Sequence, residues 1–207
     1  MAAKLMPLCD RVAAELGGAL APRARAGIHT WLERLQEWNA RIDLTAARSD
    51  DELVDLMLAD AIVLSAQIPA GARLVDVGTG AGAPGLALAL LRDDLRVTLV
   101  EPVGKRVSFL RTVLGAVGRA DVTVERGRGE DLAGSRSWDV ATSRATLAPA
   151  PWLDLGTTLV APGGHVWVLL ASGAPPAHSR ASIEAESPYL WPLTRAERRA
   201  VSYRVLG

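Results

Sequence analysis

The chain has 207 residues, 49% of them hydrophobic and 22% charged, which is typical of a soluble globular protein with one substantial core. Basic and acidic residues balance at 23 each, so any nucleic-acid binding must use a local patch. Cys9 alone cannot form an internal disulfide, and no Cys/His cluster has metal spacing. Because charges interrupt the first 20 residues and no apolar run could span a bilayer, we expect a cytoplasmic protein without metal or membrane contact.

The amino-terminal part of the chain predicts helices. Apolar residues recur at helical spacing over residues 5–20, over 26–38 and over about 50–66, where Ser49 or Asp50 can cap the helix. We therefore expect residues 1–68 to form a helical cap and residues 69–207 to form the ligand-binding domain.

After a Pro-Ala-Gly break at residues 69–71, short apolar strands alternate with helices. The expected strands are 73–77, 96–101, 121–126, 138–142 and 165–171, and the expected helices are 84–92, 104–117 and 150–160. This alternation predicts an α/β fold with a mostly parallel sheet and helices on both faces. Residues 172–187 are expected to be a loop, and 188–193 and 200–206 a closing antiparallel pair with a turn at 194–199.

A glycine-rich segment follows the first expected strand. Gly78, Gly80 and Gly82 allow a sharp turn and a close approach of the backbone to a ligand. Glu101 ends the next strand, 23 residues after Gly78, where a carboxylate can accept both hydroxyls of a ribose. The two features together predict a site for a nucleotide-like ligand.

Two cofactors fit this unit. Gly78, Gly80 and Ala83 satisfy the loose dinucleotide pattern GxGxxG/A, which would suit an NAD-dependent dehydrogenase. S-adenosylmethionine is favoured by Asp76 two residues before the first glycine, by Gly82, and by a chain too short for a second substrate domain. We expect a methyltransferase, with the dehydrogenase as the alternative.

Several further motifs occur in a specific order along the chain. They are Trp38-Asn39, Ile42-Asp43-Leu44-Thr45, Asp76 to Gly85, Gly104-Lys105-Arg106, Phe109-Leu110-Arg111, Gly127-Arg128-Gly129-Glu130, Ser143-Arg144-Ala145 and Pro162-Gly163-Gly164. In this ordered set the chain resembles, over residues 31–206, the RsmG/GidB family, whose members methylate a guanine N7 in bacterial small-subunit ribosomal RNA.

The resemblance implies a class I, Rossmann-like fold in which residues 69–207 bind S-adenosyl-L-methionine, and it implies roles at the matching positions. Cofactor contacts are expected at Asp76, Gly78, Gly80, Ala83, Glu101 for the ribose, Gly129 and Glu130 for the adenine, and Arg144. Lys105, Arg106 and Arg111 would face RNA phosphates, with the solvated face of a helix as the alternative. Apart from the resemblance, Trp152 lies near the head of the helix after Arg144, where its ring would either stack on a flat acceptor or belong to the core. Since guanine N7 offers a lone pair, no general base is required, and Arg144 is the one catalytic candidate, acting by positioning.

The chain departs from the family pattern on the acceptor side. Residues 57–61 read Met-Leu-Ala-Asp-Ala where the family shows His-Leu-Leu-Asp-Ser, and residues 170–173 lack the usual Lys-Gly pair. Two acceptors therefore remain open: small-subunit ribosomal RNA, or a small molecule methylated on nitrogen or oxygen by a paralogue. A nucleotide-binding module without catalysis is the third possibility.

Overall fold

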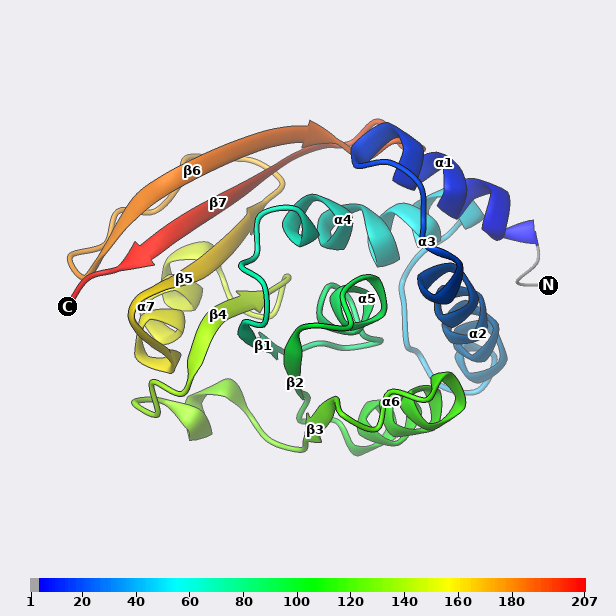
Figure 1. Ribbon diagram of the computed structural model, residues 1–207, viewed down its shortest axis with the longest axis horizontal. Helices are drawn as coiled ribbons and strands as arrows, with labels where there is room; N and C mark the ends of the chain where they lie inside the picture. The colour runs from blue at the N-terminus through cyan, green and yellow to red at the C-terminus, as the bar shows by residue number, and fades with distance from the viewer. Residues whose placement is uncertain (1–3) are drawn as a thin grey trace.

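A seven-stranded sheet forms the centre of the molecule, in the order β3-β2-β1-β4-β5-β7-β6 (Figure 1). The computed structural model describes residues 4–207. The strands are β1 (Arg73–Val77), β2 (Arg96–Val100), β3 (Thr123–Glu125), β4 (Trp138–Ser143), β5 (Val160–Leu170), β6 (Ala181–Leu190) and β7 (Glu197–Val205). Strands β1 to β5 pair in parallel, whereas β7 is antiparallel to both β5 and β6. The predicted α/β fold with a mostly parallel sheet is confirmed.

Helices cover both faces of the sheet unequally. They are α1 (Met6–Leu16), α2 (Pro22–Asn39), α3 (Asp50–Val54), the π-helical turn η2 (Asp55–Ala59), α4 (Asp60–Ser65), α5 (Gly85–Leu91), α6 (Gly104–Val117), the 3₁₀ turn η3 (Gly129–Leu132) and α7 (Pro149–Leu159). Alternate strand residues face opposite layers. Leu74 belongs to a core shared with α4, α5 and α6, and Val75 to a second core with α7.

The helices before β1 share the larger core with the sheet layer. Side chains from α1, α2 and α4 join side chains of α5 and α6 in one continuous cluster. Trp31 of α2 is fully buried, and its indole N–H donates to the Ala81 carbonyl at 2.9 Å, so α2 supports the glycine loop from behind. The division of the chain at residue 68 stays a prediction.

The carboxyl-terminal hairpin corrects the predicted boundaries. The loop expected over 172–187 is wrong from Ala181 onward, because β6 begins there, and β7 begins at Glu197 instead of 200. Strand β6 is an edge strand whose side chains are mostly exposed, so it has no alternation of apolar residues to detect. Pro188 is tolerated because an edge strand leaves one row of backbone groups unpaired. Strand β5 likewise begins at Val160, five residues earlier than expected.

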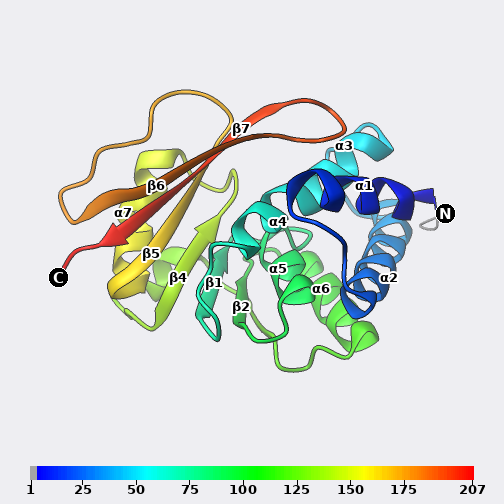
Figure 2. The same ribbon diagram turned by 45° about the horizontal axis from the view of Figure 1, so that its top comes forward.

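The hairpin turn lies over the amino-terminal helices (Figure 2). Buried Asp55 of η2 accepts hydrogen bonds from the Leu193 N–H at 3.2 Å and the Thr194 N–H at 2.8 Å. The Thr194 hydroxyl donates to the same carboxylate at 2.8 Å, and Arg195 pairs with Glu15 of α1 at 3.2 Å. These bonds fix the position of β6 and β7 beside the carboxyl ends of the parallel strands.

Candidate functional site

The glycine loop follows β1 in the conformation that its sequence predicts. Gly78, Gly80 and Gly82 have φ values of +68°, +60° and +112°, which L side chains rarely adopt. The Gly78 N–H donates to the Val100 carbonyl at 2.8 Å, and a Cβ at Gly78 would lie 2.1 Å from the Thr146 hydroxyl. The loop therefore needs glycine at this point for two independent reasons.

Asp76 is fully buried beneath this loop. Its Oδ2 accepts a hydrogen bond from the Gly85 N–H at 2.9 Å, at the start of α5. Its Oδ1 is also buried and has no partner in good hydrogen-bonding geometry among the described residues, although the Thr79 hydroxyl is near enough to lower the pKa of the carboxyl. Burial raises the pKa of Asp76 to about 6. An unpaired buried carboxylate oxygen is costly unless a donor from a ligand reaches it.

Glu101 connects the glycine loop to the segment after β2. The carboxylate is 1% exposed; Oε2 accepts from the Gly80 N–H at 2.9 Å and Oε1 accepts from the Val103 N–H at 2.9 Å. Arg106 lies 3.9 Å from Oε1. Each oxygen keeps a second lone pair, so Glu101 can still accept hydrogen bonds from two ligand hydroxyls.

A cavity of about 370 Å³, here the glycine-loop cavity, lies between these groups. The described residues that line it are Leu44, Thr45, Ala46, Leu56, Met57, Gly78, Thr79, Gly80, Ala81, Ala83, Glu101, Pro102, Val103, Arg106, Arg144, Ala145 and Thr146. It therefore brings together the predicted Gly78, Gly80, Ala83, Glu101, Arg106 and Arg144. A loop that allows close backbone approach, with a buried carboxylate hydrogen-bonded beside it, fits a nucleoside-containing cofactor.

Arg144 follows β4 directly, at the point where the strand order changes direction. Ser143 pairs with Val77, so Arg144 and Gly78 emerge side by side from neighbouring strands. The Arg144 guanidinium donates to the Leu56 carbonyl and lies 3.4 Å from the Asp60 carboxylate. Ligands in α/β sheets bind at such a switch point.

Asp60 is the common acceptor behind Arg144. Its Oδ1 accepts from the Tyr189 hydroxyl and from the Trp191 indole N–H, both at 2.8 Å, while Oδ2 faces Arg144. Asp60 is 3% exposed. The π-helical turn that precedes it presents the Leu56 carbonyl, so η2 and α4 together hold the guanidinium in place, and Tyr189 of β6 supports Asp60 from behind.

A second cavity, of about 280 Å³, adjoins the first at Arg144; we name it the Trp152 cavity. It shares Leu56, Arg144 and Ala145 with the glycine-loop cavity. Its other described lining residues are Asp60, Ser143, Leu147, Pro149, Trp152, Val168, Leu169, Leu170, Ala171, Trp191 and Arg198. The walls are mostly apolar, and guanidinium groups supply its positive charge.

Trp152 is a core residue that also lines a cavity. The side chain is 2% exposed, and its indole N–H donates to the Trp167 carbonyl at 2.8 Å, as expected for a core residue. It also lines the cavity beside Arg144. The ring therefore offers a fixed wall, and its contact with an acceptor stays a prediction.

Five predicted residues lie outside both cavities: Asp76, which is buried beneath the glycine loop, and Gly129, Glu130, Lys105 and Arg111. Gly129 is buried, where a Cβ would be 2.5 Å from Val77, and Glu130 is exposed. Lys105 is exposed on α6, and the exposed Arg111 donates to the Val124 carbonyl at 3.1 Å. The adenine and phosphate contacts assigned to these residues stay predictions.

Several site residues were not singled out from the sequence. Thr45 and Ala46 come from the segment between α2 and α3, and Thr146 lies under the glycine loop. The Asn39 side chain accepts from the N–H groups of Leu44 and Thr45 at 2.8 and 3.1 Å, so this segment is ordered by a single amide. The Asn39-to-Thr45 motif was the available signal, but spacing alone did not place it in the cavity.

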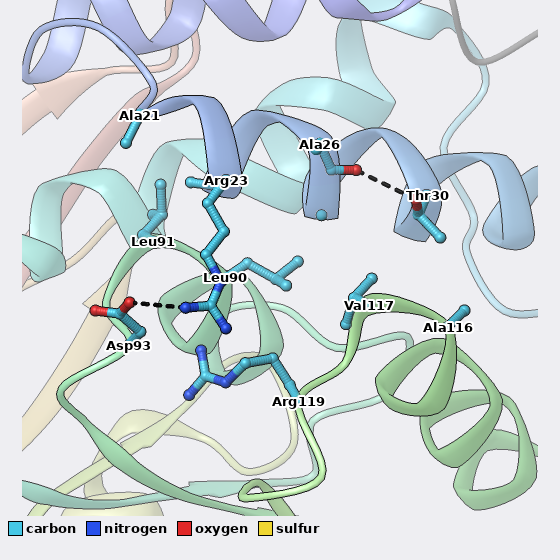
Figure 3. A pocket seen from close by; sticks show the side chains of 12 residues that line it. Ala21, Arg23, Ala26, Thr30, Leu90, Leu91, Asp93, Ala116, Val117 and Arg119 are labelled. Carbon is cyan, nitrogen blue, oxygen red and sulfur yellow. Dashed lines mark hydrogen bonds and ion pairs between the residues drawn. The ribbon is translucent and has the colours of Figure 1, made fainter.

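A third cavity, of about 320 Å³, lies between α2 and the carboxyl-terminal ends of α5 and α6 (Figure 3). Its charged groups already have partners: Arg23 pairs with Asp93 at 3.2 Å, and buried Arg119 pairs with Asp121 at 2.7 Å. It is at the opposite end of α5 from the glycine loop.

No group of three or more His, Cys, Asp or Glu within residues 4–207 is arranged to hold a metal ion. None of the helices in that range is long and apolar enough to cross a membrane.

Comparison with known proteins agrees with this geometry. The ribosomal RNA small subunit methyltransferase G of Clostridium beijerinckii is 36% identical over 167 residues, 78% of this chain and 70% of that protein. The protein of the same name from Myxococcus xanthus is 30% identical over 213 residues, 98% of this chain and 94% of that protein. An O-methyltransferase from Bacillus cereus, solved in complex with SAH, has the same fold, with a TM-score of 0.61 at 16% identity over 99% of this chain and 100% of that one.

A family model described as GidB, rRNA small subunit methyltransferase G, matches residues 25–179. The expected methyltransferase is thereby confirmed over the dehydrogenase. The chain belongs to the GidB family and is a methyltransferase that uses S-adenosyl-L-methionine as its cofactor.

Proposed function

We propose that this enzyme transfers the methyl group of S-adenosyl-L-methionine to N7 of a guanine in small-subunit ribosomal RNA. The observation that carries the proposal is that two cavities meet at Arg144. The first presents the glycine loop and Glu101 to a nucleoside cofactor, and the second has mostly apolar walls that suit a flat ring. The names of the relatives from Clostridium beijerinckii and Myxococcus xanthus support the choice of acceptor.

The cofactor would be held by groups that the glycine-loop cavity presents. Gly78, Gly80 and Ala83 would lie along it, and Glu101 would accept the ribose hydroxyls. Beneath the loop and outside the cavity lining, the buried Oδ1 of Asp76 would accept from the ammonium group. We propose that the adenine contacts Gly129 and Glu130, which do not line the glycine-loop cavity. The bound cofactor supplies an activated methyl group on a sulfonium.

Arg144 would position the acceptor base and so promote transfer. Guanine presents two acceptors on one edge, O6 and N7, and N7 must keep its lone pair free to attack. The guanidinium therefore donates to O6, which fixes N7 towards the cofactor cavity. Since no proton leaves N7, alignment and well-placed dipoles account for the catalysis, and no residue has to act as a base.

The acceptor would place one base in the Trp152 cavity and its backbone on the surface around it. Trp152 and Leu147 would flank the base inside the Trp152 cavity, which at about 280 Å³ suits one ring system. Lys105, Arg106 and Arg111 would contact phosphates of the RNA, consistent with recognition of an unstacked base in a loop. We infer a cytoplasmic location from this acceptor.

Methyl transfer from labelled cofactor to assembled small subunits and to small-subunit RNA tests the proposal. We expect incorporation that maps to a guanine N7. A transcript containing 7-deazaguanosine in place of guanosine has the same shape without the nucleophile, so it should accept no label. Incorporation into the 7-deaza transcript would contradict N7 as the acceptor atom. Absence of transfer to any RNA, with the cofactor still bound, would instead favour the small-molecule paralogue.

A further inference from the structure

A fourth cavity, of about 570 Å³, lies beside the Trp152 cavity; we name it the β6 cavity. Its described lining residues are Leu170, Ala171, Ser172, Gly173, Pro188, Tyr189, Leu190, Glu197, Arg198 and Arg199. It shares Leu170, Ala171 and Arg198 with the Trp152 cavity. The β6 cavity and the Trp152 cavity therefore meet at the Arg198 side chain, near the carboxyl end of β5.

Arg198 differs from the other arginines of β7. Its guanidinium carbon lies 3.9 Å from the centre of the Trp191 ring, and its Nη1 donates to the Glu197 carbonyl at 2.7 Å. It forms no ion pair with a carboxylate of residues 4–207. Arg199 pairs with Glu186 and Arg204 with Glu184, both at 3.2 Å. Stacking on an indole leaves the in-plane N–H groups of a guanidinium free for an anion.

The position of Arg198 is fixed through the groups behind Arg144. Trp191, on which Arg198 stacks, donates to Asp60, and Asp60 in turn faces Arg144. The two guanidiniums are therefore linked by one indole and one carboxylate, and both line the Trp152 cavity. A base held between them would have a cation at each end.

The walls of the β6 cavity suit a nucleotide. The Tyr189 ring is immobilised because its hydroxyl donates to Asp60 at 2.8 Å, and Ser172 adds a hydroxyl group. A fixed aromatic ring beside a guanidinium is the combination that binds single-stranded nucleotides by stacking and by phosphate contact. Glu197 would repel a phosphate from its side of the cavity, so an anion belongs at the Arg198 end.

We propose that the β6 cavity binds the nucleotide next to the acceptor guanine and that Arg198 binds the phosphodiester between the two. The inference rests on the proposed RNA acceptor. The Trp152 cavity would hold one base and the β6 cavity the next, and Arg198, which lies between them without a carboxylate partner among the described residues, would bind the phosphate that joins the two. Arg198 also supplies a cation on the acceptor side, where residues 170–173 contain no lysine.

Short ligands test this arrangement without requiring methyl transfer. The protein loaded with S-adenosylhomocysteine is titrated with guanosine and with the dinucleotides GpU and UpG. We expect at least one dinucleotide to bind roughly fivefold or more tightly than guanosine, the scale of one stacked base. Arg198→Ala should remove this preference and flatten the salt dependence of dinucleotide binding by about 0.7 in log-log slope. Arg198→Lys should restore the salt dependence but only part of the affinity, because ammonium does not stack as guanidinium does.

Arg204→Ala is the matched control, because Arg204 is an arginine of the same strand whose partner is Glu184. It should leave the preference intact. Thermal midpoint and S-adenosylhomocysteine affinity, measured for every variant, separate loss of the subsite from loss of the fold. Should Arg198→Ala not fold, a dinucleotide carrying 4-thiouridine beside guanine should still photo-crosslink the wild-type protein at residues 172–173 or 188–190. Crosslinks elsewhere would overturn the proposal.

The two proposals fail in different ways. If small subunits are methylated but guanosine and both dinucleotides bind equally, or Arg198→Ala keeps the preference, the β6 subsite is wrong and the proposed function stands. If no RNA is methylated but the preference depends on Arg198, the dinucleotide site stands and the ribosomal acceptor is wrong.

Discussion

At the scale of single residues, two glycines with similar backbone conformations allow the effect of ligand contact to be measured apart from the effect of backbone strain. Gly80 and Gly71 have φ values of +60° and +69°, and a Cβ at either would meet no atom closer than 3.9 Å. Only Gly80 lines the glycine-loop cavity. Alanine at either position should therefore cost about 1–2 kcal/mol of stability from the left-handed backbone.

Only Gly80→Ala should also weaken cofactor binding, by about tenfold or more, because its Cβ occupies ligand space. Calorimetry with S-adenosylhomocysteine, together with thermal unfolding of both variants, checks this expectation. Equal cofactor affinity in Gly80→Ala and Gly71→Ala would show that the cofactor does not lie against the loop at residue 80.

Asp76 should make cofactor binding depend on pH. Burial raises the pKa of Asp76 to about 6 in the free protein, and only the ionised form can accept from the cofactor ammonium with full strength. Affinity should be constant above pH 7 and fall by up to about tenfold per pH unit below 6. Titration of wild type and Asp76→Asn by calorimetry at several pH values checks this, since the variant should bind weakly without that dependence.

Stability of the free protein should change in the opposite direction. The folded pKa of Asp76 lies above the unfolded value of about 3.9, so the folded state binds more protons between roughly pH 4 and 6. This group therefore destabilises the fold progressively as pH rises through that window. The unfolding free energy of wild type minus that of Asp76→Asn should fall from pH 4 to 6, and a rise would contradict the burial of an unpaired carboxylate.

Arg144 should contribute more to transfer than to folding. We expect Arg144→Ala to lower kcat by tenfold or more, because alignment of the acceptor base is lost. Asp60 keeps its two other donors, so the stability loss should stay near 1 kcal/mol. Arg73→Ala is the control: it removes an arginine paired with Asp139 at the far end of β1, and should leave kcat unchanged. Unchanged kinetics in Arg144→Ala would make this residue an ordinary strand-end arginine.

The site residues differ in how far sequence could identify them. Gly78, Gly80 and Glu101 belong to one strand–loop–helix–strand unit, so their spacing alone predicts that they lie together. Asp60 and Trp191 are 131 residues apart, and their hydrogen bond follows from the course of the hairpin, which local patterns do not encode. Arg198 stacks on Trp191 in the same hairpin, and no local sequence pattern identifies it.

At the scale of elements, the β6–β7 hairpin depends on one buried carboxylate. Asp55→Ala would leave the N–H groups of Leu193 and Thr194 without their acceptor. We expect a loss of roughly 2–4 kcal/mol in unfolding free energy and faster hydrogen exchange confined to residues near 191–197. Thr194→Val removes one donor and keeps the carboxylate, so it should cost only about 1 kcal/mol. Unchanged exchange in Asp55→Ala would show that other contacts hold the turn.

Elements with two independent signals were predicted best. Helix α6 has the predicted bounds 104–117, because apolar periodicity ends at Gly118, a left-handed cap with φ +69°. Strand β6 has exposed side chains and one neighbour, so neither its alternation nor its length is apparent in the sequence. The π-helical turn η2 lies inside the helix predicted over 50–66. The sequence does not reveal it, because one extra residue in a helical turn only rotates the apolar face of the residues that follow.

At the scale of the whole molecule, net charge gives no indication of an RNA partner. Basic and acidic residues balance at 23 each, and many arginines are neutralised by nearby carboxylates, as Arg73 is by Asp139. Lys105 and Arg111 form no ion pair within residues 4–207, and both lie on α6, which begins next to the glycine-loop cavity. Local exposure of unpaired cations, not total charge, is what can bind a phosphate backbone here.

This distribution predicts a salt dependence that can be assigned to residues. Binding to small-subunit RNA should weaken steeply with salt, and Lys105→Ala or Arg111→Ala should each flatten the log-log slope by about 0.7–0.9. Arg23→Ala is the matched control, because Arg23 pairs with Asp93 at the opposite end of α5 and should leave the slope unchanged. Filter binding at several salt concentrations with each variant measures these slopes. If Lys105→Ala and Arg111→Ala leave the slope unchanged, as Arg23→Ala should, the exposed face of α6 does not contact RNA. The RNA would then reach the Trp152 cavity over the β6–β7 hairpin.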